Sequence, residues 1–293
     1  MAAIREIRIG LLGPGNVGSG VAEILITKRT EIEREVGLPV ILAKALVRDP
    51  DKRRGYALDP ALFTTNPADI LENPAINMVV ESMGGEEPAG EFIRRAMQAG
   101  KHVVTCNKEL VAKQGASLLK LAGERNVDFH YEASVGGGIP LIGPFKQDLA
   151  ANRLLKVRAI INGTTNYILT RMAEDGVDYA DALAEAQQLG YAEPDPTNDV
   201  EGIDAVYKLA ILATLAFKTP ISPDQIYREG ISRLTARDFR YARELGYTIK
   251  LLAMAADEAG EVEARVHPVL LESHAQLARI DGVFNAVQVE GDL

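Results

Sequence analysis

The chain has 293 residues, of which 47% are hydrophobic and 25% charged, and 32 Lys and Arg against 41 Asp and Glu give a net charge of −9. This composition excludes global disorder, and the length favours two domains. The acidic balance argues against a sequence-blind nucleic-acid binder, which needs a basic face. The one cysteine, Cys106, cannot form an internal disulfide. No secretory leader and no apolar run of roughly 18 residues is found. We therefore expect a cytoplasmic protein with no nucleic-acid or membrane partner.

The first half of the chain alternates short apolar runs with helical spacing of apolar residues. Strands are expected at residues 7–12, 40–47, 78–81, 102–105 and 128–132. Helices are expected between them, notably at 17–25, 90–99 and 115–125. Strands that alternate with helices predict an α/β fold with a doubly wound parallel sheet of the Rossmann type.

A glycine-rich turn, Gly13-Pro14-Gly15-Asn16-Val17-Gly18, follows the first strand and precedes the first helix. Glycines at this spacing allow a tight turn, close approach of the backbone to a pyrophosphate and close packing of helix on strand. The helix N-terminus faces the negative charge. Because of this position in the fold we favour a dinucleotide site over a simple tight turn. The residues expected to contact the cofactor are Gly13, Gly15, Asn16, Val17 and Gly18.

The end of the second strand indicates which nucleotide is bound. An NAD site usually has an acidic residue there for the ribose 2′-hydroxyl, whereas this chain has Arg48, followed closely by Lys52, Arg53 and Arg54. A guanidinium suits a 2′-phosphate, so NADP is favoured. Asp49 keeps NAD open, and a solvated basic turn is the alternative.

Lys108 stands just after the expected strand at 102–105. Ligands of open α/β sheets lie outside the carboxyl ends of the strands, so Lys108 is expected to point towards the site, although a lysine in this position is more often a surface residue. Cys106 is expected to be a small buried residue, because no nearby histidine could activate it as a nucleophile.

A run of glycines, Gly136-Gly137-Gly138, marks the expected boundary between a nucleotide domain at residues 1–135 and a second domain at 136–293. Such a loop can ligate a hard cation through its carbonyl oxygens. A simple hinge is the commoner role.

The second half predicts an α+β domain. Strands are expected at 157–161, 249–256, 262–271 and 283–289, and helices at 167–173, 179–189 and 200–217. Asn162 and the threonines after it are natural helix caps, and Asn198 or Asp199 is available to cap the helix at 200–217.

Two motifs of this half indicate chemistry. Glu193-Pro194-Asp195-Pro196 is an acidic loop that its prolines stiffen. Asp204 and Lys208 lie one turn apart on an apolar helix, so they share a face and are expected to border a cleft, with a lysine able to exchange a proton. An ordinary surface ion pair is the alternative.

These motifs, taken in order along the chain, closely resemble those of homoserine dehydrogenase. The resemblance is carried by Gly13 to Gly18, Asn107-Lys108-Glu109, Asn162-Gly163-Thr164-Thr165-Asn166-Tyr167-Ile168-Leu169, Glu193-Pro194-Asp195-Pro196, Asp199, Gly202, Asp204 and Lys208. It implies an enzyme that interconverts L-homoserine and L-aspartate 4-semialdehyde with NAD(P)H, in the biosynthesis of threonine, methionine and isoleucine.

The resemblance also implies roles for single residues. Lys208 matches the proton donor and acceptor, and Lys108 a second active-site lysine near nicotinamide and substrate. Glu193 and Asp204 match the carboxylates that hold homoserine, and Gly190 a residue that lines the cofactor. A sodium-like ion is implied at Glu132, Val135, Gly137 and Ile139, largely through main-chain oxygens. A homodimer built through the second-domain sheet is implied as well.

The C-terminal part departs from the family pattern. Family members continue with a further strand, a glycine-rich turn that contacts the cofactor and a helix, whereas this sequence ends at Glu290-Gly291-Asp292-Leu293, which resembles a hairpin turn. A regulatory ACT domain is not expected either. A catalytically silent nucleotide-binding module therefore remains an alternative. A related dehydrogenase for another small amino or hydroxy acid would have no reason to keep Glu193, Asp204 and Lys208 together.

Overall fold

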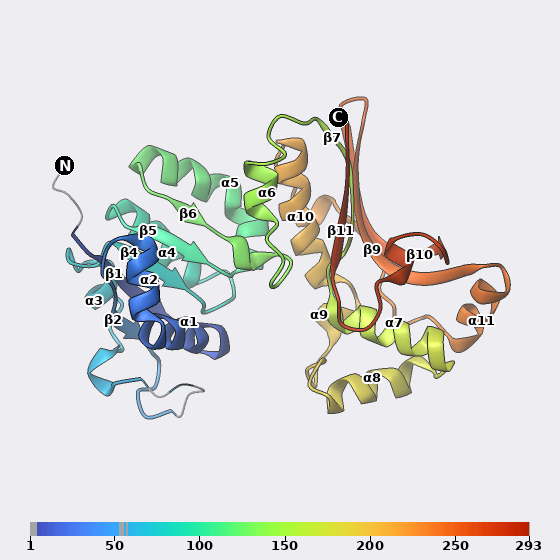
Figure 1. The fold of residues 1–293 in the computed structure, drawn as a ribbon, viewed down its shortest axis with the longest axis horizontal. Helices are drawn as coiled ribbons and strands as arrows, with labels where there is room; N and C mark the ends of the chain where they lie inside the picture. Colours follow the sequence, from blue (N-terminus) through green and yellow to red (C-terminus); the bar gives the residue numbers. More distant parts are fainter. Residues whose placement is uncertain (1–4, 53–55, 57, 293) are drawn as a thin grey trace. The chain divides into compact units, whose positions relative to one another are not determined.

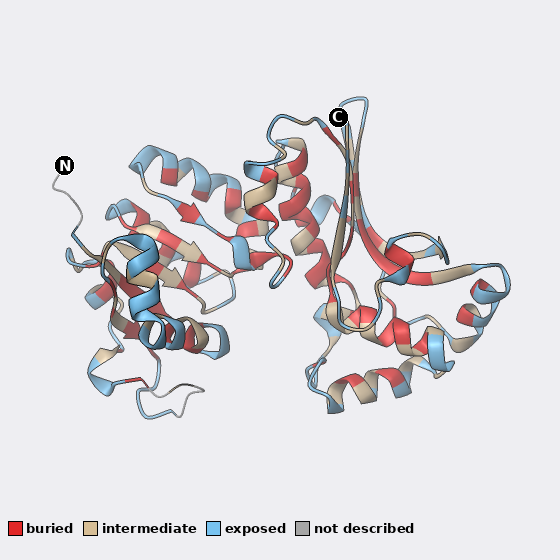
Figure 2. Ribbon diagram, viewed as in Figure 1, coloured by how far each residue is buried: buried red, intermediate tan, exposed pale blue. Residues whose placement is uncertain are grey.

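The computed structural model describes residues 5–52, 56 and 58–292, so Arg53 and Arg54 of the expected basic turn lie outside the described residues. The chain forms two compact units, Met1–Ser134 and Val135–Leu293, and the division falls next to the glycine turn at 136–138. Each unit has its own buried core, which follows the strands in Figure 2.

The first unit is built on a six-stranded parallel sheet (Figure 1). Its strands are β1 (Ile7–Leu12), β2 (Val40–Leu46), β3 (Phe63–Thr64), β4 (Met78–Glu81), β5 (His102–Thr105) and β6 (Phe129–His130). Their order in the sheet is β3-β2-β1-β4-β5-β6, and every neighbouring pair is parallel. This is the Rossmann-type strand order. From β1 the chain adds β2 and β3 on one side, and it then crosses over to add β4, β5 and β6 on the other side. The α/β class expected from the sequence is confirmed, although the two-residue β3 was not expected.

Helices connect these strands. They are α1 (Asn16–Thr27), α2 (Arg29–Val36), α3 (Ala68–Leu71), α4 (Ala89–Gln98) and α5 (Lys108–Arg125), with short 3-10 turns η1 (Pro60–Leu62) and η2 (Glu132–Ser134). Helix α5 begins at Lys108 rather than at residue 115, because the side chain of Asn107 accepts a hydrogen bond from the backbone of Leu110 and caps it. Central strand residues such as Leu11, Val79 and Val103 are completely buried, as the apolar runs predict.

The second unit contains a five-stranded mixed sheet. Its strands are β7 (Leu154–Ile160), β8 (Tyr227–Arg228), β9 (Tyr247–Glu258), β10 (Glu261–Glu272) and β11 (Ala286–Gly291), in the order β11-β7-β9-β10-β8. The expected hairpin is β9 and β10, paired antiparallel along their full length. Only β8 runs parallel to its neighbour.

The helices of the second unit are α6 (Ile142–Lys146), α7 (Gly163–Asp175), α8 (Tyr179–Gln188), α9 (Thr197–Val200), α10 (Ile203–Phe217) and α11 (Ala236–Glu244), with 3-10 turns η3 (Pro223–Gln225) and η4 (Leu277–Arg279). Helix α10 packs against β7, β9 and β10. Apolar residues repeat around most of its circumference, and Leu209 and Leu212 are completely buried.

Three expectations for this unit are wrong. The helix expected at 200–217 begins only at Ile203, because Gly202 adopts a left-handed conformation with φ 74° and separates α10 from the short helix α9. Neither Asn198 nor Asp199 caps α10, whose N-cap is Gly202 itself. Glu290 and Gly291 do not form a hairpin turn, since they continue β11 and pair with Lys156 and Leu154 of β7.

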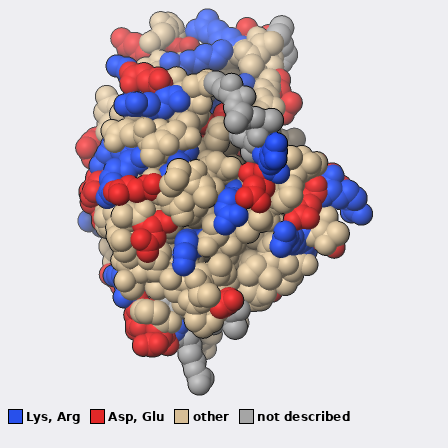
Figure 3. Space-filling model, turned by 90° about the vertical axis from the view of Figure 1, so that its left-hand side faces the viewer, with Lys and Arg blue, Asp and Glu red and all other residues tan. Residues whose placement is uncertain are grey.

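No helix among residues 5–52, 56 and 58–292 has the length and apolar character needed to cross a membrane. Figure 3 shows acidic and basic side chains interspersed over the face that it presents, without a large area of one sign.

A buried lysine fixes the connection that leads into β11. Lys250 of β9 is only 2% exposed and donates hydrogen bonds to Ile280 O at 2.7 Å, Asp281 Oδ1 at 2.8 Å and Asn166 Oδ1 at 3.2 Å. Asn166 of α7 in turn donates to Ile280 O and Phe284 O. Lysine is rarely buried unless its ammonium is paired, and here the three acceptors satisfy its three hydrogens.

We predict that Lys250→Ala lowers the free energy of unfolding by about 2–4 kcal/mol, because it opens a cavity and leaves buried acceptors unsatisfied. Urea unfolding measures this change. Lys120→Ala is the matched control: Lys120 is 79% exposed in a loose pair with Glu124, and its removal should cost less than about 0.5 kcal/mol. Equal effects of the two substitutions would contradict the prediction.

Candidate active site

The glycine turn between β1 and α1 has the conformation that a dinucleotide site needs. Gly13 has a positive φ of 87°, and a β-carbon there would lie 2.7 Å from Met83 Cγ. At Gly18 a β-carbon would lie 2.3 Å from Gly13 O and 2.5 Å from Ser82 Oγ, so only glycine allows α1 to pack this closely on the ends of β1 and β4. Gly15 borders open space. The first and third glycines thus build the turn, and the second leaves its surface accessible.

The N-terminus of α1 is suited to hold an anion. Its N-cap is Gly15, and no side chain caps it. Asn16 and Val17 are exposed, and the helix proper begins with the hydrogen bond from Ser19 N to Gly15 O at 2.8 Å. The first N–H groups of a helix have no partner within it and carry a partial positive charge. The turn therefore fits a phosphate group.

Arg48 lies just after β2 and is exposed. The next residue, Asp49, is also exposed, and its Oδ1 accepts a hydrogen bond from the backbone of Asp51 at 2.9 Å. One oxygen of Asp49, the acidic residue that would bind the ribose of NAD, thus already accepts a hydrogen bond within its own turn.

Lys108 is the first residue of α5, directly beyond the carboxyl end of β5, and is half-buried. Its neighbour Cys106 is half-buried too. Burial raises the pKa of the Cys106 thiol, and the nearby Glu81 carboxylate raises it further. These causes keep the thiol protonated, which fits the expectation that Cys106 is not a nucleophile.

In the second unit, Asp204 and Lys208 form a largely buried ion pair on α10. Lys208 Nζ lies 2.6 Å from Asp204 Oδ2, and the side chains are 17% and 6% exposed. Nζ also donates to Ile161 O at 2.8 Å, where β7 has just ended. This is not an ordinary surface pair: both groups are largely removed from water, and the small exposed part of Lys208 is what a reacting group could reach.

Asn162 holds this pair in place. Its Oδ1 accepts from Thr165 N at 2.8 Å and so caps α7, as expected from the sequence. Its Nδ2 donates to Asp204 Oδ2 at 2.9 Å and to Asp199 Oδ1 at 2.7 Å. One buried amide therefore joins the starts of α7 and α10 and the short helix α9.

The loop that carries Glu193 lies between α8 and α9. Glu193 is exposed, and Gln187 Nε2 donates to its carbonyl oxygen at 3.2 Å. Thr164 Oγ1 donates to Tyr191 O at 2.6 Å, which fixes the loop to the start of α7. Gly190, at the end of α8, is exposed with φ 77°. The backbone of the loop is thus tethered beside Asn162 and its neighbours, while the Glu193 side chain faces solvent.

The residues proposed for a cation occupy the segment around the glycine run. Glu132 is an exposed residue of η2, and Val135 is buried. Beyond them, Gly136 has φ 82°, and a β-carbon there would lie 3.1 Å from Ile139 O. Among the described residues no group of three His, Cys, Asp or Glu side chains could hold a metal ion. A cation here would depend on carbonyl oxygens.

Comparisons with known proteins agree with this geometry. Residues 140–293 match the family model described as homoserine dehydrogenase. Residues 13–132 match the model described as the NAD binding domain of homoserine dehydrogenase. The chain belongs to the homoserine dehydrogenase family.

Individual relatives and solved structures extend the comparison. Homoserine dehydrogenase of Bacillus subtilis is 42% identical over 99% of this chain and 67% of its own length. The crystal structure of the enzyme from Thiobacillus denitrificans has a TM-score of 0.93 and 48% identity over 98% of this chain and 66% of that one. A hyperthermophilic archaeal homoserine dehydrogenase in complex with NADPH has a TM-score of 0.80 and 27% identity over 98% of this chain and 88% of that one. The chain spans about two thirds of the length of the curated relatives it matches.

In the site, Asn162 and Asp199 make hydrogen bonds that the sequence did not indicate. Both belong to the motifs that carry the resemblance, but the structural role expected for Asn162 was that of a helix cap, and for Asp199 that of a possible cap. The signal for Asn162 was its place directly after a strand end, where a polar side chain can serve both a helix N-terminus and a neighbouring element. The contact to Asp199 spans a sequence separation of 37 residues and could not be inferred from spacing.

We predict that Cys106 reacts slowly with a disulfide reagent. At pH 8 the folded chain should react at least about tenfold more slowly than the unfolded chain, because burial and Glu81 disfavour the thiolate. The sequence has a single cysteine, so the released chromophore reports this site alone. Equal rates for the folded and unfolded chain would contradict the prediction.

Proposed function

We propose that this chain is an NAD(P)-dependent homoserine dehydrogenase, which interconverts L-homoserine and L-aspartate 4-semialdehyde. The observation that carries the proposal is the buried Asp204–Lys208 pair, held by Asn162 inside a domain of this family. A surface module without catalysis has no need to bury and anchor such a pair, which costs desolvation energy.

The roles of the residues follow from their chemistry. The nicotinamide cofactor supplies or accepts the hydride when it is bound. Lys208 donates a proton to the alcohol oxygen as negative charge develops there, and takes it back in the reverse direction. Asp204 holds Lys208 in place and, with Glu193, offers carboxylates to the ammonium group of the amino acid. Lys108 stands at the carboxyl edge of the nucleotide-binding sheet and is proposed as a second active-site lysine near nicotinamide and substrate.

The cofactor is proposed to lie on the glycine turn at Gly13, Gly15, Asn16, Val17 and Gly18, with Gly190 and Lys108 also lining it. The uncapped N-terminus of α1 and the open surface at Gly15 support this placement for the pyrophosphate. NADP is proposed over NAD, because Arg48 is exposed after β2 while one oxygen of Asp49 is engaged by Asp51.

A monovalent cation, sodium by its resemblance to the family, is proposed at Glu132, Val135, Gly137 and Ile139. Two observations support it. The positive φ of Gly136 closes the turn so tightly that no β-carbon fits. Within the described residues the carbonyl oxygens of Val135, Gly137 and Ile139 accept no backbone hydrogen bond, so they suit a hard cation.

We also propose that the enzyme acts in the biosynthesis of threonine, methionine and isoleucine, in the cytoplasm and as a homodimer through the second-domain sheet. A single cysteine suits a reducing compartment. The alternative, a silent nucleotide-binding module, is not favoured. Family models match both halves of the chain, and Lys108, Glu193, Asp204 and Lys208 are all present.

Lys208→Ala is expected to lower kcat about 10²- to 10⁴-fold, because the alkoxide then lacks its proton donor. Oxidation of NADPH with L-aspartate 4-semialdehyde is the measurement. Lys218→Ala, an exposed lysine at the end of the same helix, should leave kcat unchanged. Absence of turnover in the intact chain, or equal turnover by the Lys208 variant, would refute the proposed function.

Arg48→Ala is expected to reduce the preference for NADP over NAD by about 10- to 100-fold, because a charge-assisted hydrogen bond to the 2′-phosphate is lost. The ratio of kcat/KM for the two cofactors measures this preference. Arg34→Ala, in which an exposed arginine of α2 is removed, should leave the ratio unchanged. An unchanged ratio for Arg48→Ala would show that Arg48 does not bind the 2′-phosphate.

A further inference from the structure

Glu81 is a buried carboxylate at the carboxyl end of β4. It is 0% exposed. Its Oε1 accepts hydrogen bonds from the backbone of Met83 at 2.7 Å and of Gly84 at 3.2 Å. Its Oε2 accepts from Thr105 Oγ1 at 2.5 Å. A buried charge is costly unless it is hydrogen-bonded, and here both oxygens are used as acceptors.

The contact with Thr105 extends to the start of α5. Thr105 Oγ1 accepts from the backbone of Asn107 at 3.0 Å, and Asn107 then caps α5. Lys108 is the first residue of that helix. Two hydrogen bonds in series thus connect the Glu81 carboxylate to the residue that precedes Lys108.

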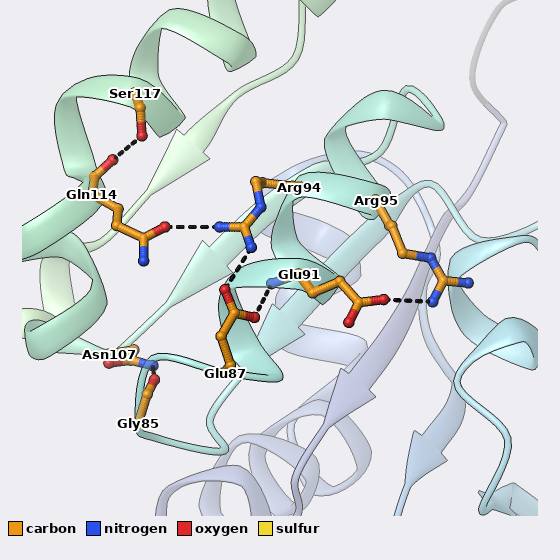
Figure 4. Close-up of polar contacts among 8 residues, drawn as sticks. All are labelled: Gly85, Glu87, Glu91, Arg94, Arg95, Asn107, Gln114 and Ser117. Atoms are coloured by element: carbon orange, nitrogen blue, oxygen red, sulfur yellow. Dashed lines mark hydrogen bonds and ion pairs between the residues drawn. The ribbon is translucent and has the colours of Figure 1, made fainter.

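The turn after β4, residues 82–88, is also tied to α4 and α5 (Figure 4). Asn107 Nδ2 donates to Gly85 O at 2.6 Å, and Arg94 joins Glu87 at 2.6 Å to Gln114 at 2.7 Å. Lys113 of α5 donates to Glu86 at 2.5 Å. The Glu81 carboxylate is completely buried, whereas the ion pairs at Glu86 and Glu87 are partly exposed and contribute less.

The same turn touches the glycine turn. Ser82 Oγ donates to Gly13 O at 2.7 Å, and Met83 packs where a β-carbon on Gly13 would stand. One of the two backbone groups that Glu81 holds, the N–H of Met83, therefore belongs to a residue packed directly against the proposed cofactor turn. Glu81 lies between the two features that the proposed function needs in this unit, the glycine turn and Lys108.

We propose that Glu81, acting with Thr105, is a positioning residue that fixes the turn at 82–85 and the start of α5, and thereby sets the positions of the cofactor turn and of Lys108. The inference rests on the proposed function for the part that concerns Lys108. Both carboxylate oxygens are acceptors, whereas glutamine has one acceptor oxygen and one donor nitrogen of nearly the same shape. Thr105 already accepts from Asn107, so it cannot satisfy a glutamine amide and keep a partner for its own hydrogen.

The test uses near-isosteric pairs of variants. Thr105→Val removes the Glu81–Thr105 contact, and Glu81→Gln leaves either Thr105 or the backbone of Met83 and Gly84 without an acceptor, both with little change in volume. Thr105→Ser keeps the hydroxyl and is the conservative rescue. Glu91→Gln, in which an exposed carboxylate of α4 that pairs with Arg95 is altered, is the matched control. NADPH binding is measured by fluorescence titration, kcat and KM by turnover of L-aspartate 4-semialdehyde, and stability by urea unfolding.

Glu81→Gln and Thr105→Val are expected to weaken NADPH binding about tenfold and to lower kcat about ten- to 100-fold, since small misplacements of reacting groups cost rates of this size. The double variant should be no more than about twofold worse than the worse single variant, because both substitutions act on the same connected set of hydrogen bonds. Thr105→Ser and Glu91→Gln should remain close to the intact chain.

Three outcomes would overturn the inference: NADPH binding and kcat of Glu81→Gln equal to those of the intact chain, a drop in kcat that only follows the loss of folded protein with NADPH binding unchanged, or additive effects in the double variant. The binding measurement needs no turnover. An intact chain that binds NADPH without turnover refutes the proposed function alone, and binding still decides the inference about Glu81.

Discussion

The buried contact between Asp204 and Lys208 is the interaction on which the second unit depends. Two opposite charges 2.6 Å apart attract strongly, but their removal from water costs several kcal/mol per ion unless other polar groups compensate. The structure provides this compensation on both sides: Asn162 donates to Asp204, and Ile161 O accepts from Lys208. The end of β7, the cap of α7 and the first turns of α10 are therefore fixed together. Helix α10 carries the ion pair, Asn162 at the cap of α7 binds Asp204, and Ile161 after β7 binds Lys208.

The first unit meets a different constraint, that of a parallel sheet whose strands all end at one edge. The turns after β1, β4 and β5 meet there, and they must pack closely while keeping their backbone groups satisfied. Gly18 allows α1 to approach, Ser82 binds the glycine turn, and Glu81 joins the turn after β4 to the start of α5. The edge is closely packed at Gly13 and Gly18 and open at Gly15, where a ligand can approach.

Much of the fold and of the site could be predicted from the sequence. Local spacing in the sequence was enough to predict three features: the glycine turn, Lys108 at a strand end, and Asp204 with Lys208 on one helix face. The errors concern places where local signals compete. Gly202 separates the short polar helix α9 from the apolar helix α10, and Glu290 with Gly291 extends a strand because β7 offers it a partner. The buried Lys250 was not indicated, because a lysine in an apolar strand gives no sign of the acceptors it will meet.

The sequence by itself determined the class of fold, the kind of cofactor turn and the side chains available for chemistry, since these follow from periodicity, from glycine conformation and from residue type. Only the tertiary structure decided how those side chains are held. Asn162 bridges Asp199 and Asp204 across separations of 37 and 42 residues, and Glu81 meets Thr105 across 24. Such contacts form only when strands and helices pack. No local sequence pattern specifies them, because the partner of a buried polar side chain depends on which distant residues the packing brings next to it.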